Sequence, residues 1–258
     1  MTNLLARAIA LALIAAAPLT AQGAPASGTD VLTRMHDAYA GKWYHTLTFV
    51  QKTTQHLPTG KDTISTWYES LRHTDATGTQ LRIDFGSPSL GNGILFTADS
   101  AWVFKDGKLL RTRDQGNDFL PLIEGVYVQS VERTVRELHG TGIDLSRVTT
   151  GRWEGRSAWI VGVQSATDSA TPQFWVDTER KVVVRMILHL TNPERTLDIH
   201  LDDYVPLGGG WLATRIWIGV DGAMIQKEEY SDWKSGIPLS DALFSQATWI
   251  TGAHWATD

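Results

Sequence analysis

Cysteine is absent from all 258 residues of this chain. Its absence excludes disulfide bonds, thiol chemistry and the lipid-modified cysteine that would tether a bacterial lipoprotein to a membrane. The sequence also lacks a Gly-x-Ser-x-Gly elbow, a His-Glu-x-x-His motif and a glycine-rich phosphate loop. These are common signatures of serine hydrolases, zinc peptidases and nucleotide-binding proteins. We therefore predict a protein that is not an enzyme and that has no cofactor and no bound metal.

An excess of positive charge is missing as well. Lys and Arg number 23 against 28 Asp and Glu, which gives a net charge of -5. Such a chain has no electrostatic footprint for nucleic acid or for an anionic membrane surface. Beyond residue 26 the sequence also has no run that is long and apolar enough to span a bilayer. We predict that nucleic acid is not a partner.

The first 26 residues have the pattern of an export signal. Arg7 precedes an uncharged run from residue 8 to residue 17, which is too short to cross a bilayer, and Ala24 and Ala26 form an Ala-x-Ala-like cleavage site. We expect residues 1–26 to be removed as a signal peptide and residues 27–258 to form a single domain. Without a cysteine anchor, the mature protein is expected to be soluble and periplasmic.

Alternation of apolar and polar residues dominates what remains, most clearly between residues 172 and 220. The even positions from Val182 to Leu190 are apolar, and between residues 197 and 202 apolar residues alternate with polar ones. This period of two is typical of half-buried strands. The pair Asp106-Gly107 lies between two such runs and predicts a two-residue hairpin turn. About a dozen strands in an antiparallel meander are expected.

Two segments show the spacing of helices instead. Residues 29–39 begin with Thr29 as a candidate N-cap, and residues 128, 131, 135 and 138 are all apolar. A long meander must curl to protect its edges, and the apolar stripes of the helices must be buried. We therefore predict a mainly β (α+β) fold, in which two or three helices cover the concave face of a large curled antiparallel sheet.

Asp198, His200 and Asp202 form the best local candidate for chemistry. Side chains two residues apart share one face of a strand, so a metal site or an acid-base pair is geometrically possible there. The same pattern is also the solvated face of an amphipathic strand. We favour this structural interpretation, and a hydrolase that uses Asp198 and His200 remains an alternative.

Four places in the sequence form a recognisable set. They are residues 47–52 after the first helix, Trp67 followed by residues 81–85 and the hairpin at 99–108, residues 174–177 running into 184–186, and residues 241–244. Together they resemble the LolA-like family of periplasmic lipoprotein carriers, which includes the LolB and RseB-type proteins. The sequence departs from the family's Arg followed by Pro soon after the Trp of the second strand, because residues 68–72 contain no Pro and Arg72 is only a loose match.

The resemblance implies an open half-barrel with an apolar pocket for acyl chains beneath its helices. The implied partners are a lipid or an acylated protein and a membrane-associated donor or acceptor protein, with the carrier itself a monomer. A periplasmic regulatory or sensor module that binds a protein partner is the alternative function. The expected ligand-binding residues are Leu47, Phe49, Trp67, Leu81, Ile83, Phe85, Phe96, Trp102, Phe119, Leu120, Val131, Val135 and Leu138.

Overall fold

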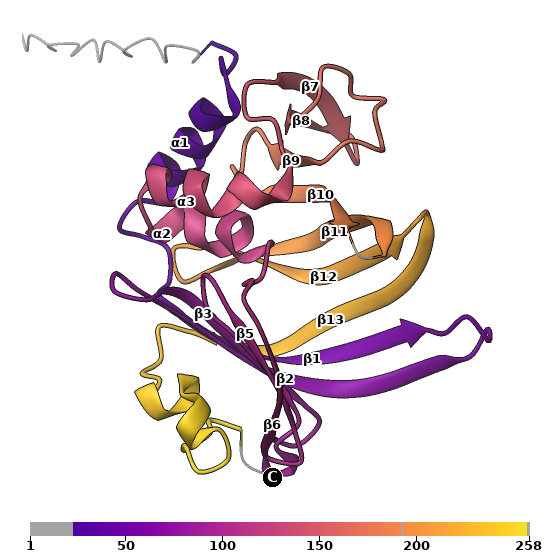
Figure 1. Cartoon of the computed structure of the whole chain (residues 1–258). Coiled ribbons are helices and arrows are strands. Elements are labelled where there is room, and N and C mark those ends of the chain that lie inside the picture. Colours follow the sequence, from indigo (N-terminus) through magenta and orange to yellow (C-terminus); the bar gives the residue numbers. More distant parts are fainter. Residues whose placement is uncertain (1–22, 192, 257–258) are drawn as a thin grey trace, which may run out of the picture.

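The computed structural model describes residues 23–191 and 193–256 (Figure 1). Most of the predicted signal peptide, including the uncharged run at residues 8–17, lies outside the described residues. What is described forms one continuous sheet with helices on one of its faces and a short C-terminal segment on the other (Figure 1).

The sheet contains thirteen strands within the described residues, every neighbouring pair is antiparallel, and it is not closed into a barrel. Its order is β6-β5-β4-β3-β2-β1-β13-β12-β11-β10-β9-β8-β7, a meander whose two halves meet where β1 pairs with β13. The predicted fold class is therefore confirmed. The strands are β1 (Thr46–His56), β2 (Asp62–Thr74), β3 (Gly78–Phe85), β4 (Gly93–Phe96), β5 (Ala101–Lys105), β6 (Lys108–Arg113), β7 (Val148–Trp153), β8 (Arg156–Val161), β9 (Gln173–Asp177), β10 (Val183–Thr191), β11 (Glu194–Leu207), β12 (Gly210–Val220) and β13 (Ala223–Ser235).

Two-residue turns join several of these strands. Asp106 and Gly107 have φ values of 50° and 73°, and Asp221 and Gly222 have φ values of 49° and 80°. Two successive residues with positive φ match the twist of a β-hairpin, and Asp-Gly is a preferred sequence for such a turn. The local sequence thus specifies the β5-β6 and β12-β13 hairpins.

Two of the three α-helices in the described residues lie in the connection between the two edge strands, β6 and β7. The α-helices are α1 (Gly28–Tyr39), α2 (Val126–Val128) and α3 (Val131–Leu138), and a π-helical turn, η2 (Pro121–Gly125), precedes α2. Within the described residues no helix is long and apolar enough to cross a membrane. Short 3-10 turns are η1 (Pro88–Leu90), η3 (His139–Thr141), η4 (Asp241–Phe244) and η5 (Gln246–Thr248).

The ends of these helices differ from the sequence prediction in two respects. The side chain of Ser27, rather than Thr29, caps α1 by accepting a hydrogen bond from the Asp30 amide. The predicted helix at 128–138 is broken after α2, because Gln129 and Ser130 have extended backbone and Ser130 caps α3 by accepting from the Arg133 amide. Serine stabilises a helix start better than a helix interior, so the chain restarts there.

The main core lies between the concave face of the sheet and the helices (Figure 1). Val31, Leu32 and Met35 of α1 are fully buried in it. A register shift between Val183 and Arg185 turns Val184 to the opposite face, where it packs beside Trp175. The even positions of β10 therefore do not all share one face, since a β-bulge interrupts the period of two.

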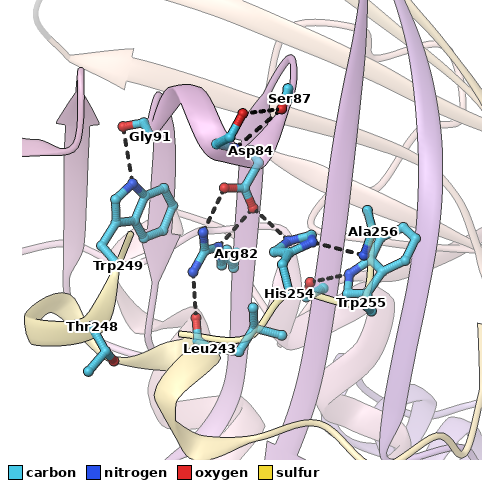
Figure 2. Close-up of polar contacts among 12 residues, drawn as sticks. Arg82, Asp84, Ser87, Gly91, Leu243, Thr248, Trp249, His254, Trp255 and Ala256 are labelled. Atoms are coloured by element: carbon cyan, nitrogen blue, oxygen red, sulfur yellow. Dashed lines mark hydrogen bonds and ion pairs between the residues drawn. The ribbon is translucent and has the colours of Figure 1, made fainter. Parts of the chain in front are cut away.

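The C-terminal segment covers part of the convex face and encloses a buried ion pair (Figure 2). Arg82 makes two hydrogen bonds of 2.8 Å to the carboxylate of Asp84, and both side chains are almost completely buried. Trp249 lies against the Arg82 guanidinium, with 3.9 Å between the guanidinium carbon and the ring centroid, and His254 approaches Asp84 at 3.2 Å. The ion pair thus joins β3 to the end of the chain.

Replacement of Arg82 by Met should lower the free energy of unfolding by about 3 to 5 kcal/mol, because Asp84 would remain as an uncompensated buried charge. The double variant Arg82→Met/Asp84→Leu should recover most of this loss. Urea denaturation measures both values. Lys52→Met, at the exposed Lys52-Glu229 pair, is the control and should cost less than about 1 kcal/mol. A double variant no more stable than Arg82→Met would contradict the explanation.

Candidate ligand-binding cavity

A cavity of about 140 Å³ lies between the concave face and the helical connection. Its floor comes from strands of both halves of the sheet, and its roof comes from η2, α2 and the residues just before them. Most of its walls are apolar or aromatic. The lining residues are Trp43, Leu47, Phe49, Trp67, Glu69, Leu71, Leu81, Ile83, Asn117, Leu120, Ile123, Glu124, Tyr127, Val182, Leu201, Tyr204, Trp211, Leu212, Ala213, Ile216, Glu228 and Tyr230.

Six of the thirteen predicted ligand-binding residues line this cavity. They come from β1, β2, β3 and the start of the roof, and their side chains share the concave face because each strand contributes alternate positions. Their role in binding remains a prediction. The six are Leu47, Phe49, Trp67, Leu81, Ile83 and Leu120.

The other seven predicted residues lie outside the cavity lining. Trp102 is on the convex face with the C-terminal cluster, because its neighbour Ala101 takes the concave position on β5. α3 packs against α1 and η2, so its apolar stripe is used in packing between helices and not at the cavity. Phe96 is buried in the main core, and Phe85 lies beside Trp67 with ring centroids 4.5 Å apart. Phe119, Val131, Val135 and Leu138 belong to the core beneath and between the helices.

Glu124 brings a carboxylate into the roof of the cavity. The indole nitrogen of Trp43 donates to Oε2 at 3.0 Å, and the hydroxyl of Tyr44 lies 2.9 Å from Oε1. Burial raises the pKa of Glu124 to about 7, although these two hydrogen bonds act in the opposite direction. Glu124 is thus held at the roof by two aromatic side chains of the segment between α1 and β1.

Glu228 of β13 is a second buried carboxylate in the wall. It accepts hydrogen bonds from Gln226 at 2.6 Å and from the Tyr230 hydroxyl at 2.7 Å. Burial is the main reason why its pKa is raised. Glu228 is therefore buried but has polar partners of its own.

Glu69 of β2 is the third buried carboxylate, and its surroundings are less polar than those of Glu124 and Glu228. It lies opposite Phe49 of β1 and Ile83 of β3 in the sheet register, so apolar side chains flank it on both strands. Burial, followed by the nearby carboxylate of Glu228, raises its pKa well above the ordinary value. The cavity therefore combines apolar walls with three acids.

Sequence reasoning missed these acids, although one signal was present. Trp67, Glu69 and Leu71 stand at successive alternate positions of β2, so the strand that was predicted to place Trp67 on the concave face places Glu69 there too. An acid between two inward-facing apolar residues indicates a buried carboxylate. No comparable local pattern marks Glu124, which lies in a π-helical turn.

The Asp198 and His200 face does not form part of this cavity. Arg185 donates two hydrogen bonds, of 2.8 Å and 2.7 Å, to the Asp198 carboxylate, and His200 lies 3.2 Å from the same group. The Trp153 ring contacts His200 edge to face at 4.7 Å. In the described part of the chain no cluster of three or more His, Asp or Glu side chains is arranged to hold a metal ion. The arrangement is that of a partly exposed ion pair.

Comparison with known proteins supports the fold. No family model and no curated protein matches this sequence. A DUF1329 family protein from Desulfovibrio piger is similar in structure, with 15% identity, a TM-score of 0.62 and coverage of 86% of this chain and 97% of the other. A domain from Vibrio parahaemolyticus, whose name refers to outer membrane lipoprotein sorting, has 11% identity, a TM-score of 0.59 and coverage of 86% and 98%.

A LolA superfamily protein from Nitrosomonas europaea covers 85% of this chain and 97% of its own length, with 12% identity and a TM-score of 0.48. The likeness to the Desulfovibrio piger and Vibrio parahaemolyticus structures, at such identities, shows the fold alone. The predicted fold, a curled antiparallel sheet with helices over one face, is confirmed at this level.

Glu124 should make the stability of the protein depend on pH. Its pKa rises from 4.5 to about 7 on folding, so between these pH values the folded protein binds more protons than the unfolded chain. Its contribution is therefore greatest below pH 4.5 and is lost as the pH rises towards 7, by roughly 3 kcal/mol. Urea denaturation from pH 4.5 to 7.5 measures the effect. Over this range the free energy of unfolding of Glu124→Gln should rise relative to that of the wild type by about this amount.

The matched control is Glu229→Gln. Glu229 pairs with Lys52 and Lys227 at the surface, and these lysines lower its pKa. The free energy of unfolding of this variant should not rise relative to that of the wild type as the pH rises. If Glu124→Gln and the wild type kept a constant difference across the range, the buried carboxylate would not be the cause.

His200→Ala should cost less than about 2 kcal/mol, because His200 and its partner Asp198 are both about 30% exposed and solvent weakens their attraction. Asp198→Ala should cost more, since it also removes the bidentate partner of Arg185. Urea denaturation gives both values. A stoichiometric transition metal that disappears with His200→Ala would overturn the structural interpretation.

Proposed function

We propose that this protein is a periplasmic carrier or chaperone that binds an acyl chain or a similar apolar ligand in the cavity beneath its helices. The observation that carries the proposal is the cavity itself, which has mostly apolar and aromatic walls and lies under a helical roof. A concave apolar site with a few polar groups is the usual form of a small-molecule binding site. The lipoprotein-sorting name of the Vibrio parahaemolyticus neighbour agrees with it.

The size of the cavity limits what the described state can hold. A cavity of about 140 Å³ is close to the volume that admits one benzene-sized group, about 150 Å³. A short stretch of chain therefore fits, and a longer acyl chain requires the roof to move outward. Each buried methylene would contribute about 0.8 kcal/mol, so even a partly buried chain could offset the cost of ordering it.

The roof is the part best suited to such a movement. Leu120, Ile123 and Tyr127 contact the cavity from a segment that contains one π-helical turn and a three-residue helix. Short helices hold together through packing more than through their own hydrogen bonds. An entering ligand would replace these packing contacts with its own. Within this proposal the protein works as a monomer and exchanges a lipid or an acylated protein with a membrane-associated donor or acceptor protein.

Ala213→Leu should weaken binding of the neutral apolar fluorophore N-phenyl-1-naphthylamine by at least about tenfold. Ala213 lines the cavity, and a leucine there would occupy space worth about three methylene groups of ligand. Fluorescence titration measures the affinity. Ala166→Leu, a matched change at a half-buried position beside Trp175 on the other face, should leave it within about twofold. Absence of saturable binding by the wild type would end the carrier hypothesis.

A further inference from the structure

Glu69 is a buried acid without a hydrogen-bond partner among the described residues. It is 5% exposed and lines the cavity. The other two acids of the cavity are held by neighbours, Glu124 by Trp43 and Tyr44 and Glu228 by Gln226 and Tyr230. The carboxyl oxygens of Glu69 are not among the fully enclosed side-chain atoms that lack a partner, so they open onto the cavity, where a bound molecule can supply the hydrogen bonds that the described chain does not.

Packing around residue 69 does not require an acidic side chain. Its two neighbours across the strands, Phe49 and Ile83, are apolar, and Trp67 and Leu71 precede and follow it on the same face. A leucine at residue 69 would extend this apolar surface without leaving a polar group unpaired. The carboxyl group is therefore placed to contact a ligand that enters the cavity.

The charges of the cavity point to the kind of group that enters. Three of its lining residues are acids, and none is Lys, Arg or His. The Glu228 carboxylate is near enough to disfavour ionisation of Glu69. An anion in the cavity would meet acidic side chains and no basic one in a site of low dielectric constant, whereas a cation would stabilise the ionised form of Glu69.

We infer that the cavity binds an amphiphile whose polar end is a protonated amine, with Glu69 as the group that receives the ammonium. This inference rests on the proposed function and names the ligand class. A primary ammonium has three N–H donors, and the Glu69 carboxylate offers acceptors that no described residue occupies. Trp43, Trp67 and Trp211 also line the cavity, and indole faces attract cations. The apolar tail would occupy the walls formed by Leu47, Leu81 and Ile216.

Three ligands with the same ten-carbon tail separate the contribution of the polar end from that of the tail. Decylamine, 1-decanol and decanoate are each titrated against the wild-type protein holding N-phenyl-1-naphthylamine, at pH 7. We expect decylamine to displace the fluorophore at least about tenfold more effectively than 1-decanol, and decanoate to be the weakest of the three. Equal displacement by decylamine and 1-decanol, or stronger displacement by decanoate, would overturn the inference.

Glu69→Gln tests the assigned residue. It keeps the shape of the side chain and should weaken decylamine at least about tenfold while leaving 1-decanol within about threefold. Glu229→Gln changes the net charge by the same amount on β13 but faces Lys52 and Lys227 at the surface, so it should not alter the preference. If Glu69→Gln folds poorly, Glu69→Leu provides the same comparison, since it removes the unpaired group altogether.

The outcomes separate this inference from the proposed function. If 1-decanol and the fluorophore bind but decylamine has no advantage, the carrier hypothesis stands and the amine is wrong. If Glu69→Gln weakens 1-decanol as much as decylamine, Glu69 acts as a general hydrogen-bonding group and the assignment of an ammonium is wrong. If neither the fluorophore nor any of the three ligands binds, the proposed function itself is wrong.

Discussion

The pairing of β1 with β13 is the contact on which the rest of the molecule depends. It joins residues at opposite ends of the chain, such as Leu47 and Ser235, and it turns two separate meanders into one sheet. A register shift between Thr48 and Val50 accompanies it, and Asp232 has a φ of 52° on the partner strand. Such a bulge increases the local bend of a sheet. The bend lies at the centre of the concave face, beneath the cavity.

The same pairing brings the acids of the cavity together. Glu69 on β2 and Glu228 on β13 lie on either side of β1, and both face the helices. Glu124 approaches from the roof, held by Trp43 and Tyr44. Three carboxyl groups from distant parts of the sequence thus share one apolar space. Their burial costs stability, a cost that the proposed binding role of the cavity would explain.

The two faces of the sheet solve the burial of charge in opposite ways. On the convex face, Arg82 and Asp84 pair with each other, and the C-terminal segment adds contacts from Leu243 to Arg82 and from His254 to Asp84 (Figure 2). On the concave face no basic side chain lines the cavity, and Glu69 has no partner within the described chain. The paired charges hold the C-terminal segment against the sheet in the folded protein. An unpaired carboxyl group can instead bind a ligand. The buried charges of the convex face are thus paired, whereas Glu69 on the concave face has no partner among the described residues.

The strands, the Asp-Gly hairpins and the mainly antiparallel architecture could be predicted from the sequence, because alternation and turn chemistry are properties of a few adjacent residues. The sequence also placed Leu47, Phe49, Leu81 and Ile83 on the cavity side. Three further features follow from the fold and not from the local sequence: Trp102 faces the convex side, the stripe of α3 packs against other helices, and Glu69 and Glu228 line one cavity from the two strands that flank β1. These outcomes depend on bulges and on pairings between residues far apart in the chain, which no local pattern encodes.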